Sequence, residues 1–136
     1  MNKRTVLVAL LVVLLVGGAI AYRLYHTGVP QAAERTADVS VPAEELFQAF
    51  QTDEVAAGQR FNDKVVSVTG TVRDILREKD GRTTVTLESG DPLGGIVCEF
   101  APGTDPGCTT GEKASIKGFC AGFNLDVLLQ RCAKSE

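Results

Sequence analysis

Residues 65–72 have the sequence Val65-Val66-Ser67-Val68-Thr69-Gly70-Thr71-Val72. Valines alternate with serine or threonine along most of this run, and a period of two is typical of a strand with one buried face and one polar face. Gly70 interrupts the alternation, and a glycine inside a strand often marks a sharp bend. The run therefore predicts a half-buried, strongly coiled strand.

Four more strand-like segments follow, and turn residues separate them. They are expected at residues 83–87, 96–100, 114–120 and 125–132. Asp80-Gly81 precedes the first of them and is a strong hairpin signal. Residues 101–111, rich in Gly, Pro and Thr, predict a loop. Five short strands in this arrangement favour a small closed barrel, with an open α+β sheet as the alternative.

The segment before these strands has a helical period instead. Pro42 suits a first helical position, and Glu44 and Glu45 suit the positive end of the helix dipole. Leu46, Phe47 and Phe50 recur at helical spacing, and Thr52-Asp53-Glu54 can begin a second helix that ends near residue 59. The fold class expected is therefore all-β with an N-terminal helical element: one or two short helices and then the barrel.

An apolar segment occupies the N-terminus. Residues 5–22 are 18 consecutive uncharged residues, mostly Val and Leu, and a helix of that length just spans a hydrocarbon core of about 30 Å. Lys3 and Arg4 precede it, so the positive-inside bias places the N-terminus in the cytoplasm and the rest of the chain outside. We expect a single-pass anchor in the cytoplasmic (inner) membrane. A cleaved signal peptide ending near Ala19-Ile20-Ala21 is the alternative.

These patterns divide the chain into three parts. Residues 1–22 are the transmembrane anchor or signal peptide, residues 23–40 a polar, unpatterned linker, and residues 41–134 the barrel domain. An ordered N-terminal arm is the alternative for the linker. From Thr27 onward the chain carries 11 basic and 17 acidic residues, a difference of −6. This acidic excess weighs against a surface built to neutralise many phosphates.

The cysteines are four in number: Cys98, Cys108, Cys120 and Cys132. An even count in a small exported domain favours two disulfides. The pairs Cys98–Cys108 and Cys120–Cys132 are preferred because each closes a short loop, while pairing of Cys98 with Cys120 or Cys132 and four unpaired thiols are the alternatives. Zinc is not expected, since no two cysteines have the close spacing of zinc ligands.

Catalytic residues are scarce in this sequence. The one histidine is His26, outside the predicted barrel, which excludes Ser–His and Cys–His pairs within the domain. Asp126 opens the last strand, where it is expected to cap the preceding turn. We therefore expect neither an enzyme nor a cofactor.

Several of these segments resemble the tRNA-anti-like OB-fold family. The most specific part is Gly118-Phe119-Cys120-Ala121-Gly122 followed by Leu125-Asp126-Val127-Leu128-Leu129 and Cys132. The strand at 65–72 and the helix start at 43–47 are similar as well, so the resemblance covers residues 43–132. It implies a five-stranded OB barrel. Asp53 replaces the expected Asn, Phe61 replaces a common Tyr, and Cys108 is an addition.

OB folds bind ligands on the face flanked by the loops between strands 1 and 2 and between strands 4 and 5. The candidate ligand-binding residues are therefore Arg73, Arg77, Arg82, Phe123 and Asn124. Acidic residues alternate with these arginines, which weighs against nucleic acid as a partner. The function expected is a non-catalytic, membrane-anchored module that binds or scaffolds an envelope protein, peptide or glycan. The alternative is single-stranded nucleic-acid binding.

Overall fold

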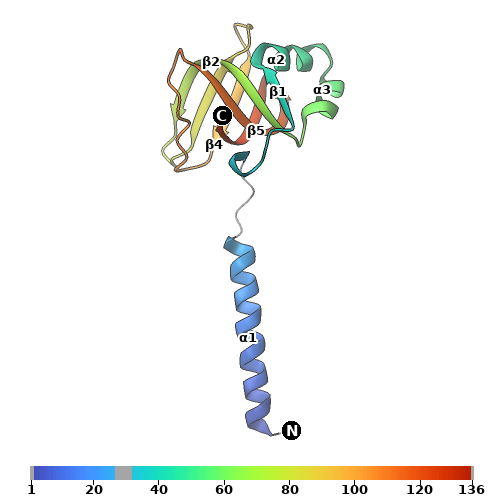
Figure 1. Cartoon of the computed structure of the whole chain (residues 1–136), viewed down its shortest axis with the longest axis vertical. Helices are drawn as coiled ribbons and strands as arrows, with labels where there is room; N and C mark the ends of the chain where they lie inside the picture. Colours follow the sequence, from blue (N-terminus) through green and yellow to red (C-terminus); the bar gives the residue numbers. More distant parts are fainter. Residues whose placement is uncertain (1, 27–31, 136) are drawn as a thin grey trace.

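The computed structural model describes residues 2–26 and 32–135, and Figure 1 shows a long helix and a barrel of strands. The helix, α1, spans Lys3–His26 and ends four residues beyond the boundary expected at Tyr22. Among the described residues, α1 is the helix that is both long enough and apolar enough to cross a bilayer. A signal sequence near an N-terminus has the same two properties. The large side chains of α1 lie exposed along its whole length, as the anchor hypothesis requires.

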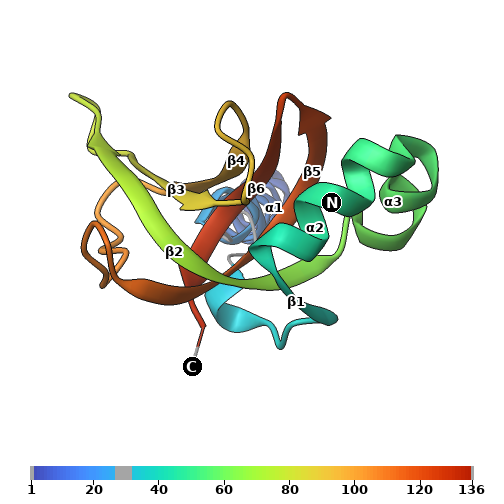
Figure 2. The same ribbon diagram turned by 90° about the horizontal axis from the view of Figure 1, so that it is seen from above.

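The barrel is closed by five strands, which confirms the expected fold class. They are β2 (Val65–Arg77), β3 (Thr83–Glu88), β4 (Gly95–Phe100), β5 (Lys113–Asn124) and β6 (Asp126–Lys134). Neighbours pair in the order β2-β3-β4-β6-β5, and β5 pairs back onto β2. The β4–β6 pair is parallel and the other pairs in the ring are antiparallel. Seen from above in Figure 2, the strands surround one core in an OB-like arrangement.

An additional strand and a short 3-10 helix precede the barrel. The strand β1 (Val39–Pro42) pairs parallel with β2, and the short helix η1 spans Ala32–Glu34. Residues 32–40, expected to be linker, are therefore ordered against the barrel. Ala32 is fully buried, and the Asp38 carboxylate accepts a hydrogen bond of 2.9 Å from the backbone N–H of Val65. In β1, the alternation of apolar and polar residues is limited to Val39 and Val41. Two residues are too few for such a pattern to predict a strand.

Two helices lie against the barrel before β2. α2 (Ala43–Thr52) buries Leu46, Phe47 and Phe50, so its predicted apolar face is confirmed. α3 (Glu54–Phe61) begins after Asp53, whose carboxylate accepts a 3.0 Å hydrogen bond from the backbone N–H of Ala56. Pro42 takes the N-cap position of α2, one residue before the position expected. Asp53 thus serves as a helix cap, a role that Asp and Asn fill about equally well.

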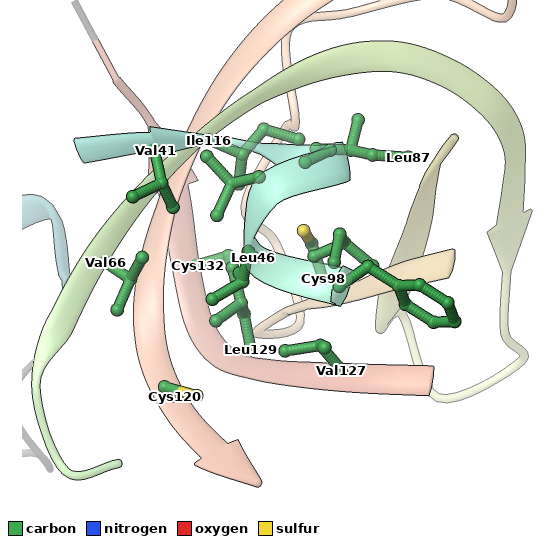
Figure 3. Close-up of a cluster of buried hydrophobic side chains, with 14 of the residues drawn as sticks. Val41, Leu46, Val66, Leu87, Cys98, Ile116, Cys120, Val127, Leu129 and Cys132 are labelled. Carbon is green, nitrogen blue, oxygen red and sulfur yellow. The ribbon is translucent and has the colours of Figure 1, made fainter. Parts of the chain in front are cut away.

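The core lies inside the barrel and under α2. Figure 3 shows side chains from α2 and the strands meeting in this interior. Buried strand residues include Val66, Val68, Leu87, Ile96, Ile116 and Leu129. On β4, Ile96, Cys98 and Phe100 are buried whereas Val97 and Glu99 are half-buried, which is the alternation that a barrel wall requires. This packing fixes the loops at both ends of the strands.

Candidate binding face of the barrel

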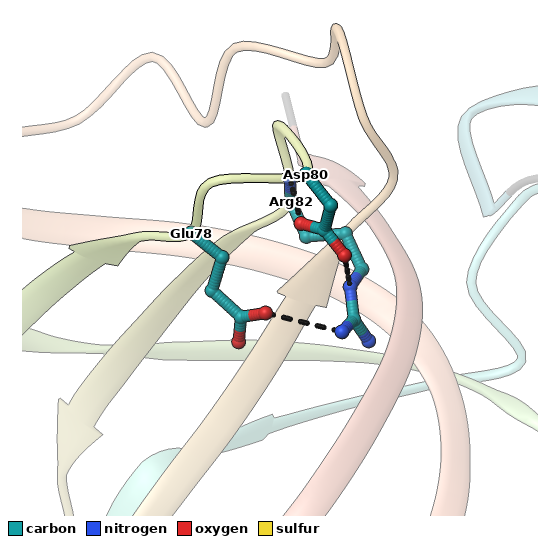
Figure 4. Close-up of polar contacts among 3 residues, drawn as sticks. All are labelled: Glu78, Asp80 and Arg82. Carbon is teal, nitrogen blue, oxygen red and sulfur yellow. Dashed lines mark hydrogen bonds and ion pairs between the residues drawn. The ribbon is translucent and has the colours of Figure 1, made fainter.

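The β2–β3 hairpin holds Arg82 in internal ion pairs (Figure 4). Its Nε donates to Asp80 Oδ2 at 2.7 Å and its Nη2 to Glu78 Oε2 at 3.1 Å. Hydrogen bonds from the Arg82 backbone and side chain hold the pKa of Asp80 below its usual value. Gly81 at the turn has φ +89°, which confirms the predicted Asp-Gly hairpin. The positive charge of Arg82 is thus largely neutralised within the hairpin.

The other two candidate arginines, Arg73 and Arg77, both lie on β2. Arg73 lies half-buried, and its Nη2 donates to the carbonyls of Asp91 at 2.9 Å and Gly94 at 3.1 Å. It therefore fastens the β3–β4 loop to the barrel wall. Arg77 is exposed at the end of β2. Arg73 and Arg82 are thus engaged within their own loops and Arg77 is exposed, and the part of all three in ligand binding stays a prediction.

Phe123 and Asn124 lie together on β5, just before the turn to β6. Phe123 stacks on Phe50 with ring centroids 5.7 Å apart and meets Phe47 edge-on at 5.8 Å. The Phe123 ring thus packs the β5–β6 hairpin against α2. Asn124 is exposed. Both residues line a surface cleft of about 360 Å³ between this hairpin and β4.

This cleft is lined by Val97, Ala121, Gly122, Phe123, Asn124, Asp126 and Leu128. Asp126 accepts a hydrogen bond of 2.7 Å from the backbone N–H of Gly95. It therefore ties the β5–β6 turn to the start of β4, rather than capping the turn at residues 122–124 as the sequence suggested. The contact holds one wall of the cleft against the other.

Two leucines that the sequence analysis did not select stand beside the cleft. Leu93 in the β3–β4 loop is 91% exposed, and Leu125 at the β5–β6 turn is 79% exposed. The two loops touch, since a Cβ placed on Gly94 would lie 2.6 Å from the carbonyl oxygen of Leu125. An apolar residue among turn residues, as in Asp91-Pro92-Leu93-Gly94, is the signal that could have revealed this surface.

The comparison with family models matches residues 1–134 to the tRNA_anti-like family. The chain belongs to the tRNA_anti-like family. Asp53 and Phe61, which differ from the residues expected for the family, both have structural roles. Asp53 caps α3, and Phe61 is fully buried in the core. Among the curated proteins, none matches this tRNA_anti-like sequence.

Two solved structures are similar to this tRNA_anti-like protein. A proposed nucleic acid-binding lipoprotein from Klebsiella pneumoniae is 17% identical, with a TM-score of 0.59, and the match covers 71% of this chain and 92% of that one. A proposed aspartyl-tRNA synthetase from Leishmania major is 15% identical with a TM-score of 0.48, over 79% of this chain and 22% of that one. At these identities the likeness to the lipoprotein shows a common OB-like fold.

A second surface of this tRNA_anti-like chain combines cations with an aromatic ring. The guanidinium of Arg131 lies 4.1 Å from the ring centroid of Phe119, and that of Arg35 lies 5.7 Å from it. Lys117 lies beside them and donates to the carbonyl of Arg35 at 2.9 Å. A hollow of about 670 Å³ adjoins these residues. Phe119 and Arg131 come from the paired strands β5 and β6, but Arg35 lies more than 80 positions earlier in the chain, so no local pattern could have indicated its contact.

The cysteines are unpaired thiols in the structure, so neither of the preferred disulfides is formed. Cys120 lies opposite Leu129 in the β5–β6 ladder, and its thiol donates to Asn62 Oδ1 at 3.5 Å. The sulfur of Cys132 lies instead over Gly118, two residues away from Cys120 along β5. Closeness in sequence therefore does not bring these two sulfurs together. Among the residues described, no group of three or more His, Cys, Asp or Glu could hold a metal ion.

Proposed function

We propose that this protein is a membrane-anchored, extracytoplasmic and non-catalytic module whose barrel face binds an apolar peptide segment of an envelope protein. The observation that carries the proposal is the exposed Leu125, which lies in sequence between the cleft residues Asn124 and Asp126, with the exposed Leu93 in the neighbouring β3–β4 loop. Exposed apolar residues gathered at a cleft are typical of a protein-binding surface.

The polar groups around the cleft favour a peptide over a glycan or a nucleic acid. Asp126 and Arg73 are engaged with backbone groups of the same loops, so they stabilise the cleft walls. Phe123 stacks on Phe50 and meets Phe47 edge-on, so part of its ring is already engaged by α2. Burial of a leucine side chain contributes about 1.5–3 kcal/mol, so two leucines can anchor a short apolar segment.

Placement outside the cytoplasm is supported by the charges at the ends of α1. Lys3 and Arg4 precede the apolar helix, and Arg23 lies in its last turn. Two side-chain cations and the amino terminus on one side against one cation on the other favour a cytoplasmic N-terminus. The ordered barrel would then face the periplasm or cell exterior.

Photo-crosslinking of the full-length chain in its membranes tests the peptide hypothesis. A photoreactive phenylalanine analogue replaces Leu125 in one variant and Val55 in a control variant. Val55 is also apolar and is 72% exposed, but it lies on α3, away from the cleft. We expect a discrete crosslinked protein at position 125 and none at position 55. The same products at both positions, or none at 125, would contradict the proposal.

Single-stranded nucleic acid is the second candidate, favoured by the stack of Arg35, Phe119 and Arg131. Cations beside an aromatic ring are the usual means of binding single strands. Anisotropy of a labelled oligonucleotide, titrated with the full-length protein in micelles, tests it. Binding that weakens as salt rises and is reduced by Arg131→Gln, but not by Arg77→Gln, supports this candidate. Absence of binding at low salt removes it.

A further inference from the structure

A cationic hollow lies where η1 meets the barrel. The hollow, of about 670 Å³, is lined by three cations, Arg35, Lys117 and Lys134, and by one acid, Glu34. From residue 27 onward the chain carries an acidic excess, so the charge of this lining is opposite to that of the domain as a whole. Such a local concentration of cations favours an anionic partner.

The lysine side chains extend into the hollow from two neighbouring strands. Lys117 of β5 donates to the carbonyl oxygen of Arg35 at 2.9 Å, and Lys134 of β6 donates to that of Gly107 at 3.0 Å. An ammonium group carries three N–H donors, so one such contact leaves each lysine able to bind an anion as well. Hydroxyl groups complete the lining, from Thr36, Ser40 and Ser135. The hollow thus combines cations with neutral donors, which are the groups that bind phosphate oxygens.

An irregularity in β6 places a fourth cation beside the hollow. Val127 and Leu129 are buried, and regular alternation would bury Arg131 as well. Arg131 instead has φ +52°, a left-handed conformation that is uncommon outside glycine. Its guanidinium lies 4.1 Å from the ring centroid of Phe119, which is two residues beyond Lys117 on β5 and so on the same face of that strand. Backbone strain of this kind is concentrated at functional positions, and here it keeps the arginine on the outer surface.

The segment from η1 to β1 also contributes two acids, Glu34 and Asp38. Asp38 accepts a hydrogen bond of 2.9 Å from the backbone N–H of Val65 and lies 3.9 Å from the guanidinium of Arg35. Its charge is therefore partly used inside the fold. The four cations outnumber the two acids of this segment, which leaves the face positive.

The covalent chain keeps this face close to the end of α1. Five residues, 27–31, separate the last residue of α1, His26, from Ala32 of η1. Such a connection cannot extend farther than about 20 Å in any conformation. Ala32 is fully buried, and η1 lies on the side of the barrel nearest to α1 (Figure 1). Because the apolar span of α1 extends to Tyr25, an inserted α1 holds the cationic hollow near the lipid headgroups.

We propose that this membrane-proximal face, formed by Arg35, Lys117, Arg131 and Lys134, binds anionic phospholipid headgroups of the bilayer in which α1 is inserted. The side-chain N–H groups donate to phosphodiester oxygens, and the surface potential of an anionic leaflet attracts the cations. A membrane is favoured over a nucleic acid because the short connection holds the face beside the bilayer at a high local concentration. The inference rests on the membrane anchoring proposed above and is independent of the ligand of the cleft.

Docking of the membrane-proximal face leaves the peptide cleft open. Phe123 of the cleft lies six residues beyond Lys117 on β5, which corresponds to about 20 Å along a strand. Phe123 also stacks on Phe50 of α2, and α2 lies on the side of the barrel away from α1 in Figure 1. The lipid contact therefore orients the barrel with its cleft directed away from the bilayer.

A single tryptophan tests the contact, because the native chain contains none. Ala33→Trp places it at an exposed position of the cationic hollow, and Val55→Trp places it at an exposed position of α3 as a control. Each full-length variant is reconstituted into vesicles of phosphatidylcholine, alone or mixed with phosphatidylglycerol, and both kinds contain the same fraction of lipid with a nitroxide on its headgroup. We expect quenching at position 33 to be at least about twofold stronger in the anionic vesicles. Position 55 should show no such difference.

Matched charge variants locate the effect. Lys117→Gln with Lys134→Gln, added to the Ala33→Trp chain, should reduce the quenching in anionic vesicles to the level in neutral ones. Arg77→Gln with Lys79→Gln removes the same charge from the region of the β2–β3 hairpin, outside the hollow, and should leave the quenching unchanged. An equal loss in both double variants overturns the assignment of this face. A rise in salt should remove the difference between vesicles without any further substitution, because exposed charges are screened, and a difference that persists at high salt overturns the inference as well.

Flotation of the same vesicles separates the inference from the anchor. A chain that floats with both kinds of vesicle but shows equal quenching in them overturns the inference and leaves the anchor standing. A chain that does not float with neutral vesicles contradicts the anchor and the inference with it. Relief of the quenching by an equimolar single-stranded oligonucleotide assigns the face to nucleic acid instead and also overturns the inference.

Discussion

Gly118 shows how a single missing side chain determines the packing of the barrel. A methyl group at this position would lie 2.5 Å from Cys132 Sγ, 3.1 Å from Leu129 Cβ and 3.2 Å from the carbonyl oxygen of Gln130. None of these atoms is the end of a flexible side chain, so the strands would have to separate. We expect Gly118→Ala to lower the free energy of unfolding by about 1–3 kcal/mol, measured by denaturant titration under reducing conditions.

The control for this substitution is Gly58→Ala. A methyl group there would meet the side-chain nitrogen of Asn62 at 3.0 Å, which can rotate away, and alanine is the better helix former within α3. Its effect on the free energy of unfolding should be neutral or stabilising.

In the double variant Gly118→Ala/Cys132→Ala, the loss of unfolding free energy caused by the alanine at position 118 should be smaller, because the sulfur is gone. Strictly additive effects would show that the sulfur does not fill this space.

Alkaline pH provides a second test at the scale of single residues. Because the pKa of Cys132 is raised above its usual value near 9, the reduced folded state keeps this thiol neutral while the unfolded state ionises. Its contribution to stability is thus fully present below pH 9 and is lost as the pH rises through the folded-state pKa. We expect the unfolding free energy of the reduced protein to fall between pH 8 and 10.

Comparison with Cys132→Ala isolates this contribution. Burial raises the pKa of Cys120 as well, so some alkaline loss should remain in the variant. The fall in unfolding free energy between pH 8 and 10 should nevertheless be smaller than in the reduced native chain. Identical pH profiles would mean that Cys132 is not buried as a neutral thiol.

At the scale of elements, α2 is part of the domain core rather than an appendage. The ring of Phe50 lies 5.7 Å from that of Phe123 on β5 and 6.0 Å from that of Phe61 on α3, and its side chain is buried. One side chain thus joins two helices to the hairpin that forms the cleft. We expect Phe50→Ala to cost about 3–5 kcal/mol in chemical denaturation. Val55→Ala, at an exposed position of α3, should change stability by less than about 0.5 kcal/mol.

Local patterns in the sequence determined most of these elements. The valine alternation of β2, the Asp80-Gly81 turn and the apolar face of α2 each involve neighbouring residues, and each was confirmed. β1 was missed because it has only four residues and acquires its hydrogen bonds from β2, more than 20 residues away. Short elements of this kind depend on tertiary pairing rather than on their own pattern.

The candidate site was predictable only in part, for the same physical reason. Phe123 and Asn124 both line the cleft because the β5–β6 hairpin that carries them is local, and their part in ligand binding stays a prediction. The side chain of Arg73 was expected to face a ligand, but it reaches the carbonyls of Asp91 and Gly94, which a strand pattern does not place. Likewise, the conformation of Arg131 decides which residues of β6 face inward, and nothing in a regular alternation indicates it.

At the scale of the whole molecule, the fate of α1 decides where the barrel acts. A helix that stays in the membrane holds the domain at its surface, whereas a cleaved signal peptide would release it. The apolar segment continues to Tyr25 in one uninterrupted helix, through the small residues Ala19 and Ala21 that could support cleavage. Such a continuous span, with Lys3 and Arg4 at its start, is more typical of an anchor than of a short signal-peptide core.

We therefore expect the mature protein to retain residues 1–22 and to expose its barrel outside the cytoplasm. Mass spectrometry of the membrane fraction should give the intact N-terminal segment, and protease added to spheroplasts should remove the barrel while a cytosolic marker survives. Replacing Lys3 and Arg4 by Gln, with two lysines inserted after His26, reverses the charge bias and should protect the barrel in a large share of molecules. A soluble mature protein beginning near Tyr22 would contradict retention, and a barrel protected in native spheroplasts would contradict the orientation.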